Sequence, residues 1–504
     1  MSRLDLIHDL RSFAFGQPFW HYVWFALFLT TCYYLATTVY CVYFHTLAKY
    51  PGPRLYAASQ IPYAVVFAFG DGHNTIARLH REYGKVVRIA PDRLSFSSPD
   101  SWNEIMGHQK KDRNREHGKT PNFYDPLSIP GTDREAHARQ RRILAVGFSA
   151  SYIVEQESII HYYVGLLMNR LKENGQDGTK PLNMVNWFNW TTFDIVGDLA
   201  FGESFGCLET GVYHPWVSLM FTHVKLGAWN YAIAQFPTFS KIIRAFVPKS
   251  MTKKVEEHHA YTRDLVDRRL ETDSSRLDLF RAMAHPRDGL SMSKEEIYSN
   301  TGTLVEAGSE TTSTALSGVL FHLLKSPEAM KKVKDEIRGT FKSEDEITYV
   351  SVQNLEYLSA CVREGLRIYP PIPSTVPRIT PKDGSIIFGE WVPPDTKLDI
   401  WQFPLSRNEE FFKDADKYVP ERWLGDPRYQ SDCREASQPF SVGPRDCLGK
   451  NIANGEMRII LSRLLWNFDV RLADDSVNWD QGQKVYIIWL KSPLNVYLTP
   501  VKRS

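Results

Sequence analysis

A single cysteine near the C-terminus lies in a loop whose residue types suit the presentation of one thiolate to one metal ion. Four residues at fixed spacing surround Cys447: Phe440, Gly443, Arg445 and Gly449. The first glycine allows a tight backbone turn, and the second lets a following helix approach closely. Backbone N–H groups in such a loop can hydrogen-bond the sulfur and hold it as an anion. This pattern favours a metal ligand over the usual fate of a lone cysteine, which packs as a small apolar residue.

A second set of reactive side chains lies inside a predicted helix. Residues 307–312 read Ala-Gly-Ser-Glu-Thr-Thr, so Gly308, Glu310 and Thr311 fall within about one helical turn. A glycine in a helix interior costs up to about 1 kcal/mol relative to alanine, so another interaction or a function should offset that cost. The alternative is an exposed glutamate with two helix-surface threonines. Because the chain also contains the cysteine loop, we interpret residues 307–312 as part of a catalytic site.

Together the two motifs resemble those of the cytochrome P450 superfamily, the haem–thiolate monooxygenases. The family loop has Phe, two residues, Gly, one residue, Arg, one residue, Cys, one residue and Gly, and every fixed position is met here. The resemblance implies that Cys447 is the axial metal ligand of haem b. A thiolate ligand pushes electron density onto iron and favours O–O bond cleavage. The resemblance also implies that three residues of the same loop contact the cofactor: Phe440, Arg445 and Gly449.

The run at residues 307–312 matches the family's oxygen-activation motif of Ala or Gly, Gly, any residue, Asp or Glu, Thr, and Thr or Ser. By that resemblance Gly308 opens space beside the iron for oxygen. Thr311 hydrogen-bonds the oxygen and a water. Glu310 feeds protons inward from solvent, which is a general-acid role.

The resemblance also implies cations for the two haem propionates. Residues 133–142 read as the start of a helix, which puts His137 and Arg141 four residues apart on one face. The family commonly has tryptophan where His137 stands, although a histidine can still donate a hydrogen bond. Arg378 and Arg445 are the other two candidates. The alternative for each arginine is an exposed surface charge, the commoner fate of this residue.

A further motif concerns the support of the fold. Glu364 and Arg367 lie three apart, on one helix face, and Arg422 belongs to a Pro-Glu-Arg-Trp run at residues 420–423. A solvated surface pair is the usual meaning of such spacing. The resemblance implies instead a buried cluster of these three residues behind the haem. Removing one partner of a buried ion pair should cost several kcal/mol.

The fold that the resemblance implies is mainly α with small β-sheets, the cytochrome P450 fold. Ser293 and Glu296 form a predicted capping box, and a 3.6-residue apolar period then runs from about Lys294 to Lys325, where Pro327 stops the helix. About 30 helical residues span roughly 45 Å, enough to cross a domain. Residues 187–205 read as core structure without chemistry.

An uncharged stretch near the N-terminus predicts a membrane anchor. Residues 22–44 contain no Asp, Glu, Lys or Arg, and this length crosses a bilayer as a helix. The predicted organisation is a short segment at 1–21, a transmembrane anchor at 22–44, a Pro-rich hinge at 45–54 and a haem-binding monooxygenase domain at 55–504. A cleaved signal peptide is the alternative, but no small-residue cleavage site follows the apolar run. We expect a single-pass protein of the endoplasmic reticulum membrane whose catalytic domain is cytosolic.

The composition of the chain limits the kinds of partner that it is expected to bind. The 504 residues hold 60 basic and 58 acidic side chains, so no overall charge favours nucleic acid. The six cysteines include no C-x-x-C pair, which argues against a zinc site or a dithiol redox motif. So few cysteines in a chain of this length also argue against a disulfide scaffold. No flavin or nicotinamide domain is recognisable, so NADPH is expected to act only through a partner, NADPH–cytochrome P450 reductase, with cytochrome b5 as a further candidate. The basic residues proposed for that contact are Arg134, Arg139, Arg142 and Lys450.

The expected activity is oxidation of an apolar small molecule, by resemblance a polyketide or terpenoid intermediate of fungal secondary metabolism. Apolar and aromatic residues are common in the stretches that should line the substrate pocket. These stretches are 119–129, 213–246, 298–306, 372–376 and 486–489. One alternative is a reductase-independent haem–thiolate isomerase or peroxide-using enzyme. Another is a non-enzymatic haem- or lipid-binding membrane protein.

Overall fold

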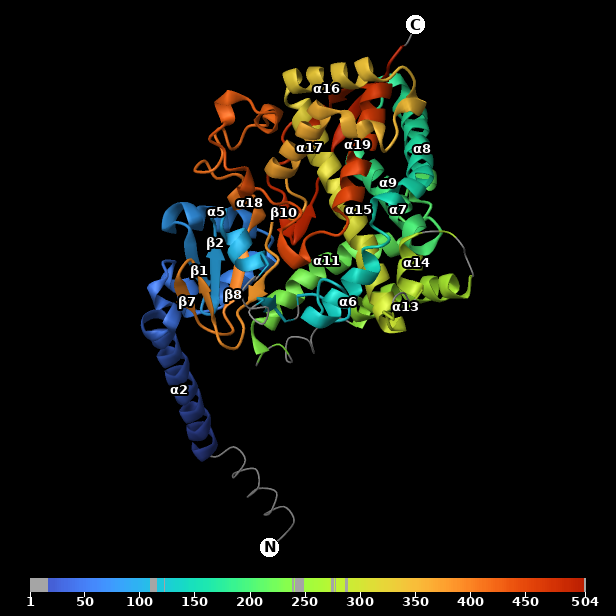
Figure 1. Ribbon diagram of the computed structural model, residues 1–504. Coiled ribbons are helices and arrows are strands. Elements are labelled where there is room, and N and C mark those ends of the chain that lie inside the picture. Colours follow the sequence, from blue (N-terminus) through green and yellow to red (C-terminus); the bar gives the residue numbers. More distant parts are fainter. Residues whose placement is uncertain are drawn as a thin grey trace.

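A long central helix runs through the domain, and the other elements pack around it (Figure 1). This helix, α15, spans Lys294–Leu324. The Ser293 hydroxyl accepts from the Glu296 N–H at 3.3 Å, and the Glu296 carboxylate accepts from the Ser293 N–H at 2.8 Å. This capping box satisfies N–H groups that a helix start leaves unpaired. The predicted helix, its cap and the stop before Pro327 are confirmed.

The computed structural model describes residues 17–108, 116–121, 123–237, 240, 249–272, 276, 278–285 and 289–502. Helices predominate in this part of the chain, and the expected class, mainly α with small β-sheets, is confirmed. The α-helices are α2 (Gln17–Val39), α3 (Arg54–Ala58), α4 (Ile61–Ala68), α5 (Gly72–Tyr83), α6 (Arg134–Leu144), α7 (Ala150–Glu155), α8 (Glu157–Gly175), α9 (Met184–Phe201), α10 (Cys207–Thr210), α11 (Pro215–Ala234), α13 (Lys249–Glu271), α14 (Leu279–Ala284), α15, α16 (Pro327–Thr340), α17 (Glu356–Ile368), α18 (Gln402–Ser406) and α19 (Lys450–Asn467).

The largest sheet lies on the side of the domain next to α2, and most long helices lie on the other side (Figure 1). The largest sheet has the order β1-β2-β8-β5-β3, in which only β2 and β8 pair in parallel. Three smaller sheets are β4-β12-β9, β10-β11 and β6-β7. The strands are β1 (Val86–Ala90), β2 (Arg93–Phe96), β3 (Gly118–Lys119), β4 (Leu182–Asn183), β5 (Arg378–Ile379), β6 (Ser385–Ile387), β7 (Glu390–Val392), β8 (Lys397–Ile400), β9 (Phe468–Leu472), β10 (Lys484–Tyr486), β11 (Ile488–Leu490) and β12 (Asn495–Pro500).

Helix α9 packs closely along α15 and belongs to the largest apolar core. A Cβ atom at Gly308 would lie 3.1 Å from the Val196 side chain, so this glycine lets the two helices approach. The core role expected for residues 187–205 is confirmed for α9, nearly all of whose residues are buried. Asn189, part of an Asn-Trp-Thr triplet, is buried among them.

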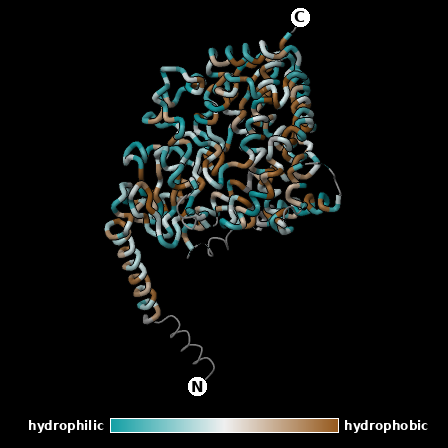
Figure 2. Tube along the Cα trace, viewed as in Figure 1, coloured by the Kyte–Doolittle hydropathy of each residue, from teal (hydrophilic) through white to brown (hydrophobic). Residues whose placement is uncertain are grey.

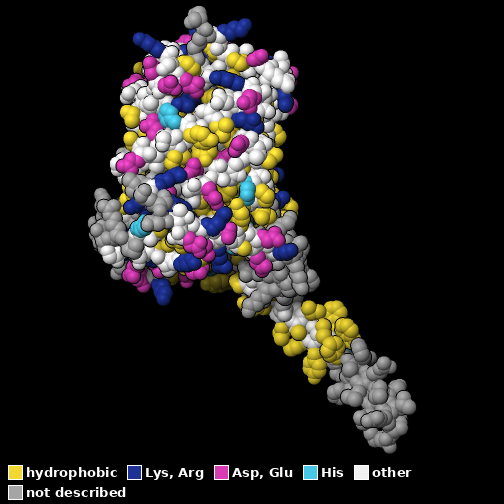
Figure 3. All heavy atoms as spheres, turned by 90° about the vertical axis from the view of Figure 1, so that its right-hand side faces the viewer, with side chains coloured by type: hydrophobic (Ala, Val, Ile, Leu, Met, Phe, Trp, Pro, Cys, Tyr) yellow, Lys and Arg dark blue, Asp and Glu magenta, His cyan; other side chains and the backbone are white. Residues whose placement is uncertain are grey.

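The anchor segment projects from the domain. Helix α2 continues into the short π-helix η1 (Tyr40–Phe44), and the apolar span Phe19–Phe44 is long and apolar enough to cross a membrane, with none of it buried against the rest of the chain. Figure 2 shows the segment mostly brown and white, and Figure 3 shows its hydrophobic side chains extending away from the domain. The helix starts before the predicted Tyr22, at Gln17. Of the predicted N-terminal segment, residues 1–16 lie outside the described residues.

Candidate active site

The cysteine loop is shaped by backbone contacts. The Cys447 N–H donates to the Phe440 carbonyl oxygen at 2.8 Å, closing the loop around the short helix η11 (Gly443–Arg445). Gly443 has φ +82°, and a Cβ there would overlap the Met106 carbonyl oxygen, so only glycine fits. The Cys447 side chain is accessible to water. Nearby protein atoms raise the pKa of its thiol by desolvation, and a hydrogen bond from the Gly449 N–H lowers it.

Two of the predicted propionate ligands hold this loop to its neighbours. The Arg141 guanidinium, on α6, donates to the Asp446 carbonyl oxygen at 2.7 Å and to the Asp446 carboxylate. Arg445 donates to the Glu116 carboxylate and to the Thr132 carbonyl oxygen, both at 3.0 Å. Both arginines therefore stand beside the thiol-bearing loop, and each has protein partners there.

Cations converge next to the loop. Arg378 on β5 lies directly opposite Lys119 on β3, and like charges facing each other across a strand pair are unfavourable. Arg378 is 3% exposed, and its Nε–H donates to the Met106 sulfur at 3.1 Å. One of its terminal nitrogens has no hydrogen-bond partner among the described residues. Burial and the neighbouring Arg445 charge together lower the pKa of Arg378 to about 10.

The same concentration of positive charge acts on two other groups. Burial lowers the pKa of His137 to about 3, with Arg445, Arg141, Lys119 and Arg378 adding to the effect. Burial, then Arg378 and Arg445, hold the pKa of Lys119 well below its usual range, while Glu116 opposes them. A buried arginine N–H without an acceptor is costly, so an anionic group fits here. Haem b, with two propionates, satisfies both the thiol and this cation cluster.

The sequence did not identify Lys119 as a cation of this cluster. It opens a stretch expected to line the substrate pocket, and no motif marks it. Its position becomes significant only through the pairing of β3 with β5, which joins segments about 260 residues apart.

One face of α15 is accessible at mid-helix. Ala307 is exposed, and Leu304, Gly308 and Thr311 are half-buried, although α15 crosses the interior of the domain. These four residues recur at helical spacing and share one face. The Thr311 hydroxyl donates to the Ala307 carbonyl oxygen at 2.6 Å. A helix surface that is open at this point suits the approach of a cofactor and a small substrate.

Glu310 lies on a different face of α15 and meets Lys491, which follows β11. Glu310 is 2% exposed, and one of its carboxylate oxygens, Oε1, accepts from the Lys491 ammonium. Direct proton uptake from solvent, as the resemblance implied for Glu310, does not fit this burial. Protons must reach the carboxylate through neighbouring groups. Lys491 lies 181 residues further along the chain and belongs to none of the motifs.

The predicted support residues Glu364, Arg367 and Arg422 come together with no exposed surface. Arg367 donates to both Glu364 oxygens, at 2.8 and 2.9 Å, and the Arg422 Nε–H donates to Oε1 at 3.0 Å. Burial opposes the Glu364 charge, but Arg367 and Arg422 bring the net pKa below its usual value. Two further donors to this carboxylate were not anticipated: the Trp423 indole and the Val419 N–H, each at 2.9 Å.

Some of the stretches expected to line a pocket are joined by hydrogen bonds. The Ile129 N–H donates to the Asn300 side chain at 2.9 Å, and the Ser374 hydroxyl donates to the Ile487 carbonyl oxygen at 2.8 Å. Trp489 is instead buried and stacks on Tyr369. Of the stretch 213–246, residues 238–239 and 241–246 lie outside the described part of the chain.

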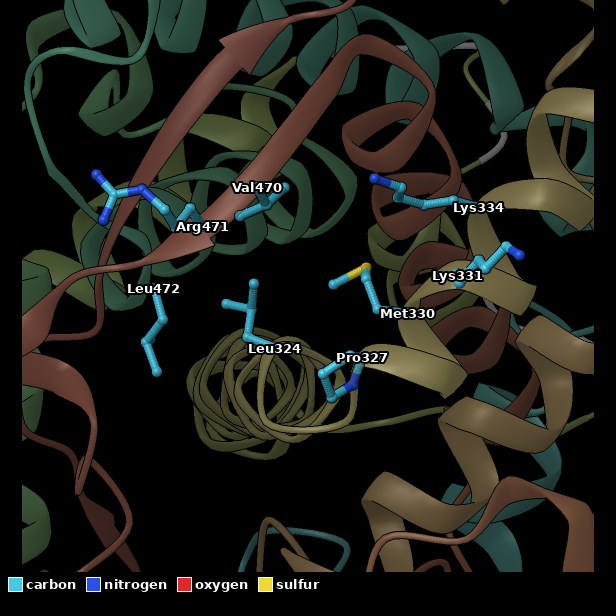
Figure 4. Close-up of a pocket in the computed structure, with 8 residues that line it drawn as sticks. All are labelled: Leu324, Pro327, Met330, Lys331, Lys334, Val470, Arg471 and Leu472. Carbon is cyan, nitrogen blue, oxygen red and sulfur yellow. The ribbon is translucent and has the colours of Figure 1, made fainter.

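A surface groove near the C-terminal end of α15 is a different feature (Figure 4). Leu324, at its floor, lies thirteen residues beyond Thr311, which is about 20 Å along the helix axis. The groove is therefore separate from the accessible helix face. Its lining combines apolar and basic side chains: Leu324, Pro327, Met330, Lys331, Lys334, Val470, Arg471 and Leu472.

A thiol-bearing loop beside a cation cluster that accommodates two carboxylates is the arrangement that a haem–thiolate protein requires. Comparison with known proteins agrees. The profile of the family described as Cytochrome P450 matches residues 59–498. The chain therefore belongs to the cytochrome P450 family.

Relatives cover nearly the whole chain. Cytochrome P450 monooxygenase cpaH of Aspergillus oryzae is 42% identical over 95% of this chain and 94% of its own length. Cytochrome P450 monooxygenase atr2 of Stereocaulon alpinum is 40% identical over the full length of both. Trichothecene C-15 hydroxylase of Fusarium sporotrichioides is 40% identical over 93% of this chain and 96% of its own. The chain is a cytochrome P450 monooxygenase; its family binds haem b, and such enzymes generally draw electrons from NADPH through a partner reductase.

Proposed function

We propose that this enzyme is anchored in the endoplasmic reticulum membrane by residues 19–44, with its catalytic domain in the cytosol. We further propose that NADPH–cytochrome P450 reductase supplies its electrons, with cytochrome b5 as a second donor. Its substrate is an apolar polyketide or terpenoid intermediate of fungal secondary metabolism. The observation that carries this proposal is the accessible Ala307–Thr311 face of α15 in a chain that also presents an accessible thiol at Cys447.

Each site residue has a task in this proposal. Cys447 holds the haem iron, and the haem, when bound, supplies the centre that activates oxygen. Arg141, Arg378 and Arg445 hold its propionates, together with His137 and Lys119. Thr311 places its hydroxyl oxygen on the open face of α15, with the hydroxyl hydrogen donated to the Ala307 carbonyl oxygen, and Glu310 holds a proton or releases one at its carboxylate. Further contacts to the cofactor come from Phe440, Gly308 and Gly449.

The membrane assignment rests on the span Phe19–Phe44, which has the length and composition of a bilayer-crossing helix and is not buried in the domain. The helix is rich in aromatic residues, which favour membrane interfaces. Pro51 and Pro53 follow it and stiffen the connection to α3. A helix of this kind is better suited to lipid than to water, since its exposed surface is largely apolar and carries no charged side chain.

The reductase proposal keeps two of the four basic residues named for it. Arg142 and Lys450 are exposed, and both flank the cysteine loop region through α6 and α19. Arg139 instead pairs with Glu296, and Arg134 lies 3.4 Å from Glu116. An acidic partner surface would be attracted most strongly to the cations that remain exposed.

The substrate class rests on the relatives. One is named for hydroxylation of a trichothecene at C-15, and the others are named as fungal monooxygenases. The stretches proposed to line the pocket include half-buried apolar residues such as Ile129 and Leu304. An apolar substrate would be held mainly by such contacts.

The test is expression of the full chain with a fungal NADPH–cytochrome P450 reductase in yeast microsomes. After reduction under carbon monoxide, we expect the strongly red-shifted band of thiolate-ligated haem from the wild type and its loss in Cys447→Ser. Extracts of fungal secondary metabolites should then yield a product heavier by one oxygen atom, formed only with NADPH.

Other outcomes of this experiment decide between the alternatives. Product formed from a peroxide without NADPH would assign the chain to the reductase-independent type. Recovery of the full chain in the soluble fraction would refute the anchor, whereas removal of residues 1–44 should release the domain from the membrane. If a protein with the correct spectrum oxidises none of the apolar components of the extract, the proposed substrate class is wrong.

A further inference from the structure

The ammonium group of Lys491 is held wholly by one helix. It donates to the Glu310 carboxylate, to the Thr314 hydroxyl at 2.6 Å and to the Ser313 hydroxyl at 3.5 Å. An ammonium has three N–H donors, so all three find oxygens on α15. The Lys491 and Glu310 side chains are each 3% exposed. Two charges buried this deeply are retained only where each offsets the desolvation of the other.

The Glu310 carboxylate is satisfied on one side only. Its Oε1 accepts from Lys491 and, at 3.3 Å, from the Thr314 hydroxyl, while its buried Oε2 has no hydrogen-bond partner among the residues that the structure describes. An unpaired buried carboxylate oxygen is costly, and such an atom in a native structure calls for a functional explanation. The free oxygen is the atom through which this carboxylate can pass a proton on.

We propose that Lys491 is a positioning residue for proton delivery: it fixes the Glu310 carboxylate through Oε1, keeps it charged at rest, and leaves Oε2 available for proton exchange. This inference rests on the proposed role of Glu310 in supplying protons to the reaction on the open face of α15. In the exchange a proton passes from the Lys491 ammonium to Oε1, which leaves a neutral amine and a neutral carboxylic acid. The acid group then turns about its Cγ–Cδ bond, releases this proton to the reaction from its other side and becomes a carboxylate again. The amine takes a proton from water and becomes an ammonium again, so both groups return to their starting charges.

The charges around the pair are consistent with that exchange. Burial raises the pKa of Glu310 against the opposing effect of Lys491, and burial lowers the pKa of Lys491 against the opposing effect of Glu310. The two shifts bring the proton affinities of the acid and the amine closer together, so that a proton moves between them at a smaller cost than in water.

Other titratable groups that face Glu310 come from neighbouring elements. Burial raises the pKa of Tyr213, which precedes α11, and the Glu310 charge raises it further. Burial, then the charges of Asp480 and Glu310, raise the pKa of Tyr369 after α17. Both phenols therefore stay neutral at physiological pH. Within the described part of the chain, Lys491 is the cation that acts on the Glu310 pKa.

A hydrogen-bonded chain links this pair to less buried residues. The Ser313 hydroxyl donates to the buried Asn189 side chain on α9, whose amide donates to the Tyr213 hydroxyl at 2.9 Å. Tyr213 in turn donates to Asn186 at 3.1 Å, and both of these residues are half-buried. An amide does not relay protons readily, so we assign this chain to holding Ser313 in place and give proton transfer to Lys491.

The first test is infrared spectroscopy of the full-length, haem-loaded protein in its resting state. Lys491→Met removes the ammonium and keeps an unbranched side chain. Without its cation, buried Glu310 should be protonated at neutral pH, and a new carboxylic acid C=O band should appear. The band should be absent from Lys491→Met/Glu310→Gln and from the control Lys342→Met, which changes an exposed lysine.

The second test measures NADPH oxidation by the reconstituted enzyme with a fungal reductase, without added substrate, in H₂O and in D₂O. Lys491→Met should slow the oxidation about tenfold or more and enlarge the solvent isotope effect, because general-acid assistance contributes a factor of this order or greater. A wild-type rate and isotope effect, together with no new acid band in a variant with the normal haem spectrum, would overturn the proposal.

Failure of the single variant to fold is also informative. If Lys491→Met alone does not accumulate but the double variant does, the loss comes from an unpaired Glu310 and the pairing is supported. If neither folds, Lys491 is required for packing and the proposal fails. The infrared result does not depend on substrate or reductase, so an enzyme that produces no oxidised product would count against the proposed function alone.

Discussion

Two buried glutamates in this enzyme have opposite environments. Glu364 accepts from two arginines, an indole and a backbone N–H, so both its oxygens are satisfied, and its pKa falls below the usual value. The Glu310 Oε1 accepts from one lysine and one hydroxyl, its Oε2 accepts from no group in the described part of the chain, and its pKa rises. A fully satisfied ion cluster fixes a structure, whereas a partly satisfied one can still exchange a proton.

The partners differ in kind as well as in number. Arginine offers a planar fork of donors that matches a carboxylate and stays charged when buried. Lysine is a point charge whose pKa shifts readily on burial, as that of Lys491 does. The Glu364 cluster therefore has a fixed protonation state, and the Glu310 pair does not.

The largest effect should come from Glu364→Ala. It strands Arg367 as a buried charge and leaves Arg422 with Asp432 as its remaining carboxylate partner. Such a loss costs about 3–5 kcal/mol, a large part of the stability of an ordinary domain. We expect little or no folded, haem-loaded protein, measured as the ratio of haem to protein after purification. The matched control is Glu409→Ala, at an exposed position. Normal haem content in Glu364→Ala would show that folding does not need the Glu364 cluster, and the structural role that separates Glu364 from Glu310 would be refuted.

A smaller effect should appear in the pH dependence of stability. A carboxyl with a lowered folded-state pKa stabilises the protein above its unfolded pKa and loses that effect as pH falls through the folded value. This is the case for Glu364, below about pH 4.5. Glu310, with a raised pKa, has the opposite sign: its contribution falls as pH rises from about 4.5 to its folded value.

Glu310→Gln should therefore make the slope of the unfolding temperature against pH more positive just above pH 4.5 and leave the acid limb unchanged. Circular dichroism melts of the haem-loaded protein at closely spaced pH values provide the measurement. A curve merely displaced from the wild type, with the same slope throughout, would mean that Glu310 titrates as it does in the unfolded chain.

The smallest effect should come from Thr314→Val, which removes the hydroxyl between Lys491 and Glu310 without stranding a charge. The hydroxyl accepts from Lys491 and donates to Glu310, so the expected loss is about 2 kcal/mol of unfolding free energy for two hydrogen bonds. Urea denaturation can measure it against Thr303→Val, whose hydroxyl bonds only to the Ser299 carbonyl oxygen of its own helix. Equal losses in both variants would show that Thr314 adds nothing to the pair.

Local patterns in the sequence predicted what local physics determines. The bounds of α15 follow from a capping box and a proline, and the loop around Cys447 follows from the spacing of its glycines. Lys491 and Lys119 could not be found in this way, because their partners are far away in the chain. Gly308 was expected to make room beside iron, but its neighbour Val196 becomes apparent only once α9 packs on α15.

The tight seating of Gly443 on Met106 has a consequence for directed evolution of this enzyme. No larger residue fits at that turn, so randomising residues 440–449 would yield mostly inactive clones. The open side of α15 has no such restriction at Leu304 or Ala307, which have accessible side chains. Libraries that seek new regioselectivity should therefore concentrate diversity on that helix surface and leave the thiolate turn unchanged.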